Sequence, residues 1–210
     1  MTELCQDFVV QPCLDNIHMI RFTPTDQATP KAGDVLLSEP FLDDPYFGRK
    51  VVLLCEHNDE GSFGFVLNNY VDIQMDEVMD DLPKIQTRIS VGGPVKNSNL
   101  YYIHTRQDIL DSTLVCPGVY MGGDFDQIKS MLQDGQLTSD EIRFFIGYSG
   151  WSATQLSEEI QSKSWFVSQA ESGDIMRTDE DNETFWKRLI SSMGDDFDHI
   201  ANAPSDPSLN

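Results

Sequence analysis

Basic residues are scarce in this sequence. Lysine and arginine together number 14, against 35 aspartate and glutamate residues, so the formal net charge is −21. Nucleic-acid phosphates and anionic lipid headgroups are bound through clustered lysine and arginine, and no such cluster is present. The charge therefore argues against direct nucleic-acid binding and predicts a strongly solvated surface.

Long apolar runs are also missing. No window approaches the roughly 18 uninterrupted apolar residues that a membrane-spanning helix needs. The opening stretch, MTELCQDFVVQPCLDNIHMIRF, has neither the basic region nor the apolar core of a secretion signal. These absences predict a cytoplasmic protein that does not associate with membranes.

Metal-binding and disulfide motifs are absent as well. The cysteines are isolated, without a C-x-x-C pair, which is typical of free thiols in a reducing compartment. None of the histidines has a ligand at the spacing of H-E-x-x-H or a comparable zinc motif. We therefore predict no metal and no cofactor. The cysteines are Cys5, Cys13, Cys55 and Cys116.

Short apolar segments with strand character dominate what is present. The runs at 49–57 and 62–69 are joined by NDEG, and this arrangement predicts a β-hairpin. Pro117 and Gly118 interrupt a further strand-like stretch. The predicted strands are 33–40, 49–57, 62–69, 88–95, 100–105, 112–123, 141–150 and 164–169.

Helices are interspersed irregularly among these strands. One is expected at 74–81, one at 124–135 with Asp124 as its N-cap, and one from Ser152 onward. A further helix, the final one before Gly194, is amphipathic, with Trp186, Leu189, Ile190 and Met193 on one face. This irregular order favours an α+β fold over a regular alternating α/β fold. We expect an N-terminal arm at 1–29, one domain at 30–194, and an acidic tail at 195–210 that is extended or disordered.

The segment FFIGYSGW (144–151), which precedes a predicted helix, raises three alternatives. Ser149 could be the nucleophile of a G-x-S-x-G elbow, but Trp151 stands where that motif needs glycine. The turn could cradle an anion at a helix N-terminus. Ser152 and Gln155 could instead form a capping box that satisfies the same N–H groups. The last alternative, a structural corner, is favoured because capped helices are common.

A second glycine turn, VGGPV (91–95), permits positive φ and close backbone approach. A tight structural turn is the favoured interpretation, and contact with a ligand is the alternative. If a small-ligand site exists, we expect the turns at 56–58, 68–69, 92–94 and 148–151 to share one end of the fold around a pocket. Its candidate residues are Glu56, His57, Asn68, Gly92, Gly93, Tyr148, Ser149 and Trp151.

Several segments, in this order, resemble the YqgE/AlgH family of bacterial proteins. The similarity extends over residues 30–168, and the C-terminal segments WKRLISSMG and PSDPSLN are similar to longer, Bacteroidetes-type members. The resemblance implies a compact single domain of the α+β class, with a twisted, bulged, mainly antiparallel sheet and short helices. The matching segments are GDVLLSEPFLDDPYFGRKVVLLCEHNDEGSFGFVLNN, VGGPV, LYYIH, GVYMGGDFDQI and RFFIGYSGWSATQLSEEIQSKSW.

The resemblance implies no catalytic residues, because the family has no established enzymatic activity. Some members are called transcriptional regulators by name, but no helix-turn-helix is readable here and the charge has the wrong sign for DNA. We therefore expect a regulatory or protein-interaction module with a protein partner, without catalytic activity of its own. The alternative is a small-ligand-binding protein or hydrolase-like enzyme with its site at the four turns. The edge strands of such a sheet can also support a homodimer.

Overall fold

The structure of the chain is a computed structural model that describes residues 29–73, 75, 79, 82, 85 and 87–204. Most of the expected arm at 1–29, the last residues of the tail and most of the helix expected at 74–81 lie outside this range. Among the residues described, no helix combines the length and the apolar character needed to cross a membrane.

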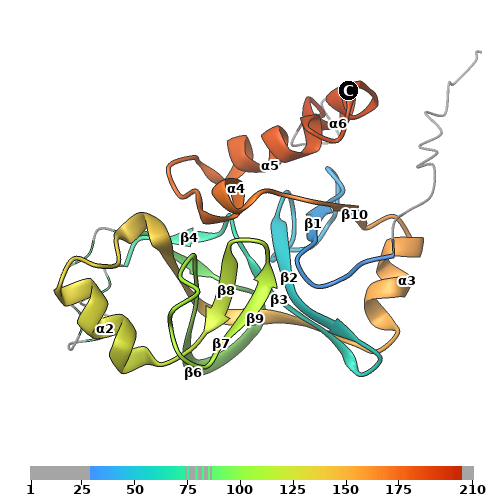
Figure 1. The fold of residues 1–210 in the computed structure, drawn as a ribbon. Helices are drawn as coiled ribbons and strands as arrows, with labels where there is room; N and C mark the ends of the chain where they lie inside the picture. The colour runs from blue at the N-terminus through green and yellow to red at the C-terminus, as the bar shows by residue number, and fades with distance from the viewer. Residues whose placement is uncertain are drawn as a thin grey trace, which may run out of the picture.

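One curled, mainly antiparallel sheet forms the centre of the molecule (Figure 1). Its strand order is β10-β1-β2-β3-β9-β6-β8-β7, with β4 paired to β5 and β5 paired to β9. Each segment predicted as a strand overlaps at least one strand of the structure. The hairpin predicted from 49–57 and 62–69 is confirmed. The strands are β1 (Val35–Ser38), β2 (Val51–Asn58), β3 (Gly61–Val66), β4 (Tyr70–Val71), β5 (Ile89–Val91), β6 (Val95–His104), β7 (Ser112–Cys116), β8 (Val119–Gly122), β9 (Ile142–Ser152) and β10 (Trp165–Ser168).

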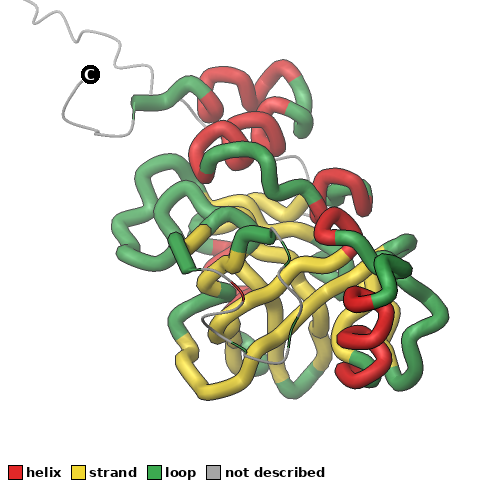
Figure 2. The backbone as a smooth tube through the Cα atoms, turned by 90° about the vertical axis from the view of Figure 1, so that its left-hand side faces the viewer, coloured by secondary structure: helices red, strands yellow, loops and turns green. Residues whose placement is uncertain are grey.

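Short helices cover the sheet from different sides, as Figures 1 and 2 show. Asp124 caps the first of them as predicted, because its carboxylate accepts from the amides of Asp126 and Gln127. Asp181 caps the amphipathic helix in the same way. The helices are α2 (Phe125–Gln133), α3 (Gln155–Gln161), α4 (Ser172–Met176), α5 (Asn182–Ser191) and α6 (Asp198–Ala201), with 3₁₀ turns η1 (Ser139–Glu141) and η2 (Asp195–Phe197).

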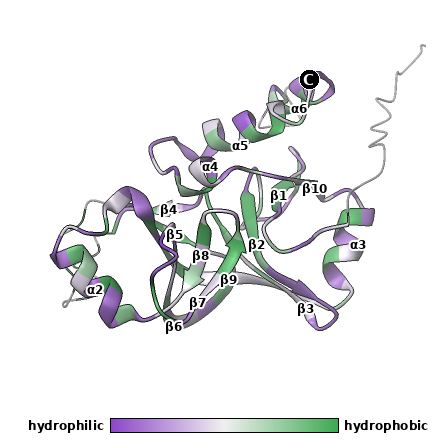
Figure 3. Cartoon of the chain, in the orientation of Figure 1, coloured by the Kyte–Doolittle hydropathy of each residue, from purple (hydrophilic) through white to green (hydrophobic). Residues whose placement is uncertain are grey.

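Three apolar clusters fill the spaces between the sheet and these helices. The largest lies between the inner face of the sheet and α4, α5 and α6, and includes Phe65, Phe145 and Trp186. A second lies under α2, and a third under α3 around Trp151 and Trp165. The apolar colouring of Figure 3 is accordingly strongest on strands such as β2 and β8. The α+β class and the compact domain predicted from the sequence are confirmed.

The strand-to-helix corner expected at 148–151 is wrong, because β9 continues through it to Ser152. Residues 149–152 pair antiparallel with 61–64 of β3, so their backbone groups serve the sheet. Helix α3 begins only at Gln155, and Thr154 is its N-cap. Of the predicted capping box, the contact from the Ser152 amide to the Gln155 side chain is present, at 3.3 Å.

The tail was expected to be extended or disordered, and its described part is neither. Residues 195–201 form η2 and α6, which follow directly on α5. Ile200 and Ala201 are buried in the largest cluster, and Phe197 packs edge-on against Phe166 of β10. The acidic side chains between them are exposed. The segment is therefore amphipathic, which its overall acidic composition does not indicate.

Arg143 of β9 is fully buried and joins the sheet to the helical layer. Its guanidinium donates to the carbonyls of Ile175 and Arg177 near α4, and to the carbonyl of Leu67 after β3. Burial lowers the pKa of this side chain, although it stays far above neutrality as an arginine. A charged donor that bonds several carbonyls is strongly stabilising. Its loss would remove a donor from the buried carbonyl of Ile175 and leave the Leu67 carbonyl with Ser90 Oγ as its side-chain donor.

Replacing Arg143 by methionine should therefore lower the free energy of unfolding by about 3 kcal/mol, since several buried acceptors lose a charged donor. Urea denaturation followed by circular dichroism measures this difference. The matched control is Lys187→Met, which removes an exposed cation paired with Glu183 and should cost about 0.5 kcal/mol or less. Equal losses in the two variants would contradict a structural role for Arg143.

Candidate functional site

The VGGPV turn packs directly on strand β9. The amide of Gly92 donates to the carbonyl of Ile146 at 2.9 Å. A Cβ atom on Gly92 would collide with the carbonyl of Gly147, and one on Gly93 would collide with Tyr148 and Ser149. The close approach predicted from the paired glycines is thus real, and here its partner is the protein's own backbone.

Ser149 of β9 is one of the residues in contact with the VGGPV turn. It is fully buried, and its hydroxyl donates to the carbonyl of Gly92 at 3.0 Å. Because this hydroxyl is buried and bonded to backbone, a substrate cannot reach it. The geometry therefore rules out the nucleophile alternative for Ser149 and supports its interpretation as a small side chain that bonds to nearby backbone.

Trp151 and Tyr148 leave β9 toward different apolar clusters. Trp151 is 6% exposed, and its indole N–H donates to Glu159 Oε2 at 2.8 Å. Trp165 donates to the same oxygen, also at 2.8 Å, so one carboxylate of α3 joins two indoles. Tyr148 is half-buried against Phe63 and Tyr101, with ring centroids 5.0 and 5.8 Å away.

Asn68 lies at the other end of the β2–β3 hairpin from Glu56. It is fully buried, accepts from the amide of Val51, and donates to the carbonyls of Arg49 and Asn182. Glu56 lies five positions after Val51 in β2, which is about 16 Å along a strand. The four turns therefore do not share one end of the fold, contrary to expectation, and Asn68 serves to hold the hairpin and α5 together.

At the tip of this hairpin, His57 and Ser62 face each other across the strands. The distance from His57 Nδ1 to Ser62 Oγ is 2.7 Å, and the neighbouring Glu56 carboxylate accepts from Asn58. A role for Glu56 and His57 in ligand binding stays a prediction that the geometry does not strengthen.

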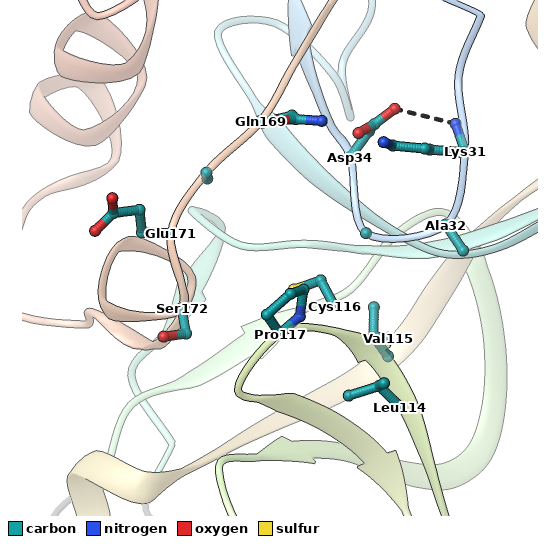
Figure 4. Close-up of a pocket in the computed structure, with 12 residues that line it drawn as sticks. Lys31, Ala32, Asp34, Leu114, Val115, Cys116, Pro117, Gln169, Glu171 and Ser172 are labelled. Atoms are coloured by element: carbon teal, nitrogen blue, oxygen red, sulfur yellow. Dashed lines mark hydrogen bonds between the residues drawn. The ribbon is translucent and has the colours of Figure 1, made fainter.

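The groove detected in the described part of the chain lies elsewhere and has a volume of about 690 Å³ (Figure 4). Three segments form it: 31–34 before β1, 114–117 at the end of β7, and 169–172 between β10 and α4. Leu114, Val115, Cys116 and Pro117 supply an apolar wall. Lys31, Asp34 and Gln169 lie together across the groove from this wall, whereas Glu171 lines it with its side chain pointing away; Ser172 completes the polar lining.

Close backbone contacts bring these three segments together. Gly33 has φ of +92°, and a Cβ on it would come within 2.8 Å of Cys116 Cβ and 2.9 Å of the Val115 carbonyl oxygen. Val35 pairs with Ser168, which places the segments before β1 and after β10 side by side. At the third junction, a Cβ on Gly118 would lie 3.2 Å from Ser172 Oγ. Glycine is thus required where the groove segments meet.

The groove side chains include a thiol, Cys116, and a buried carboxylate, Asp34. Burial raises the pKa of the half-buried Cys116 thiol, so this thiol is protonated at neutral pH. Asp34 is buried, and its Oδ2 accepts from the Lys31 amide at 3.1 Å. Throughout the described residues, no group of three or more histidine, cysteine, aspartate or glutamate side chains could hold a metal ion.

Sheet edge β7 forms one rim of the groove. Among the residues described, β7 pairs with β8 alone, and it is the last strand of the sheet. Leu114 is 58% exposed on this strand, although it is a large apolar side chain. An unpaired edge with an exposed leucine is a place where another chain can bind.

Sequence reasoning missed this groove entirely. Its residues come from three separate segments, none of which carries a recognisable motif. The available signals were Gly33 directly before a strand and the Pro117–Gly118 pair, which interrupts a strand-like run. Both could be recognised as turns, but neither indicates which other segment it meets.

The cysteines should react slowly with alkylating reagents. A raised pKa means a smaller thiolate fraction at a given pH, so Cys116 should react with iodoacetamide several-fold more slowly than free cysteine at about pH 8, and faster as pH rises. Cys55, which is buried and whose pKa burial also raises, should not react until the protein unfolds. Mass spectrometry of the separated cysteine peptides, with a urea-unfolded control, measures both rates. Alkylation of Cys116 faster than free cysteine would instead indicate an activated thiol.

Comparison with known proteins places the chain among bacterial relatives. The AlgH-like family model matches residues 35–198. A UPF0301 protein of Cytophaga hutchinsonii is 40% identical over 85% of this chain and 98% of its own. A UPF0301 protein of Bacteroides thetaiotaomicron is 36% identical over 89% of this chain and 94% of its own.

Two solved structures share the fold. A crystal structure of a Corynebacterium diphtheriae protein superposes with a TM-score of 0.71 at 24% identity, covering 84% of this chain and 94% of that one. The solution structure of AlgH from Pseudomonas aeruginosa gives a TM-score of 0.64 at 24% identity, covering 80% and 93%. The match to the family model and the identity to the bacterial relatives together show that this chain belongs to the AlgH-like family.

Proposed function

We propose that the protein is a cytoplasmic regulatory module that acts by binding a segment of a partner protein, without catalytic chemistry of its own and without direct DNA contact. The groove between segments 31–34, 114–117 and 169–172 is the binding site. The observation that carries this proposal is the exposed Leu114 on an unpaired sheet edge beside that groove.

The distribution of exposed apolar residues supports this site. Large apolar side chains are 38–65% exposed at a few positions, and Leu114 is the one that lies on the groove. Around it, backbone groups and polar side chains offer hydrogen bonds, as a peptide-binding surface requires. The volume is also sufficient for several side chains of a bound segment.

The environments of the candidate nucleophiles Ser149 and Cys116 support a protein without catalytic activity. Ser149 is buried and bonded to backbone, and burial keeps the Cys116 thiol protonated. The net charge of −21 supports a protein partner over DNA, because a strongly acidic surface repels phosphates. Free thiols at Cys55 and Cys116 support a reducing compartment.

Selection from a displayed library of random peptides of about 12 residues, long enough to follow a strand and a groove, tests this function. Peptides enriched on the wild-type protein should lose at least about tenfold in affinity on Leu114→Glu, since a charge would replace an apolar contact. The matched control is Leu110→Glu, because Leu110 is 65% exposed and lies outside the groove. Affinities are measured by fluorescence anisotropy of the labelled peptides.

Enrichment of peptides whose affinity is the same for wild type, Leu114→Glu and Leu110→Glu would place binding elsewhere and contradict the proposal. Failure to enrich any peptide would contradict it as well. Both substitutions lie at exposed positions, so circular dichroism should show unchanged folding in each variant.

A further inference from the structure

We propose that the groove receives an extended, positively charged peptide, which adds as a new strand along the free edge of β7. This inference rests on the proposed function and adds the conformation and the charge of the bound segment. It is carried by the edge geometry of the sheet and by the charges around the groove.

The two edges of the sheet differ in how accessible they are. At one end, β10 has Trp165 and Phe166 buried, and Phe197 of η2 packs against Phe166. At the other end, Thr113 and Leu114 of β7 are exposed, and this strand pairs only with β8 within the described part of the chain. An exposed strand with unpaired backbone groups is a template for a further strand.

The available length of this edge is limited by Gly33. Its backbone approaches the carbonyl of Val115 and the side chain of Cys116 so closely that no strand can pass between them. A bound strand can therefore pair along Ser112–Leu114 and then continue into the groove between 31–34 and 169–172. Main-chain pairing would supply part of the affinity, and the groove would select side chains.

Charge decides what kind of peptide fits. Two acidic residues and one cation, Lys31, line the groove: the Asp34 carboxylate is buried there, and the Glu171 side chain extends from its edge, away from the apolar wall (Figure 4). The whole chain carries −21, so its field attracts a cationic segment and repels an anionic one. The same field opposes pairing of two copies of this chain edge to edge, because each carries the same large negative charge. A basic peptide from a different protein is therefore the occupant that complements this surface.

The first test uses the peptides selected as described above and asks about their conformation. Synthetic versions are methylated on alternate backbone nitrogens, in one set at odd positions and in another at even positions. Only alternate N–H groups of an added strand point toward β7. One set should therefore lose at least about tenfold in affinity, and the other no more than about threefold. Equal losses in both sets would overturn strand addition.

The second test concerns charge. The selected peptides should be rich in lysine and arginine, and their affinity should fall as salt rises to about 0.3 M. Glu171→Gln should weaken binding about two- to fivefold, and Lys31→Gln should leave it unchanged or strengthen it. Glu158→Gln removes an exposed carboxylate on α3, outside the groove, and should have no effect. Weaker binding in Lys31→Gln, or selected peptides that are neutral or acidic, would overturn the charge assignment.

Failure of this inference can be distinguished from failure of the proposed function. Selected peptides that depend on Leu114 could still be acidic, or could lose the same affinity in both methylation sets. Either result would keep the proposed peptide-binding groove and would overturn the inference that a basic peptide adds as a strand. Absence of any Leu114-dependent peptide would overturn both. The other possible occupant of this edge is a second copy of the chain, and light scattering tests it by measuring the oligomeric state. A wild-type dimer that dissociates in the Leu114→Glu variant would assign the edge to a second copy and overturn the inference.

Discussion

Close backbone contact between the VGGPV turn and β9 is the constraint on which the rest of the sheet depends. Strand β9 pairs with β3, β5 and β6 over its 11 residues, so three neighbours must reach the same backbone. Gly92 and Gly93 allow the chain to pass from β5 to β6 in contact with it, and Gly147, with φ of +71°, bends β9 to meet them. Any side chain at Gly92 or Gly93 would push these strands apart.

Buried polar groups then attach the outer layers to this sheet. Arg143 serves carbonyls near α4, Asn68 bonds the start of β2 and the start of α5, and Glu159 of α3 accepts from two tryptophans. Each ties a short helix to strands of the sheet, and the contacts of Arg143 and Asn68 join segments 32 and 114 residues apart. Helices of four to ten residues are too short to be stable by themselves, so these contacts and the apolar clusters hold them in place.

The groove results from incomplete closure of the curled sheet. Strand β7 reaches the segment before β1 only at Gly33, and the remainder of its edge stays unpaired in the described structure. Two of the polar candidates from the sequence, Ser149 and Asn68, are buried and make their hydrogen bonds inside the protein. For binding another molecule, the protein offers the edge of β7, the exposed side chain of Leu114 and an electrostatic field set by its net charge.

The sequence by itself determined the strands, the capped helices and the α+β class, because these depend on local periodicity and on nearby capping residues such as Asp124. It also determined the sign of the surface charge and that Gly92 and Gly93 allow close backbone approach. Tertiary structure alone decided that the strand predicted at 141–150 runs on through Trp151 to Ser152, that 195–201 is helical, and that Asn68 and Glu56 lie apart. Local propensity could not show these, since pairing with β3 and burial of Ile200 are contacts between distant segments. For the same reason, only the folded chain brings Lys31, Leu114 and Glu171 to one groove.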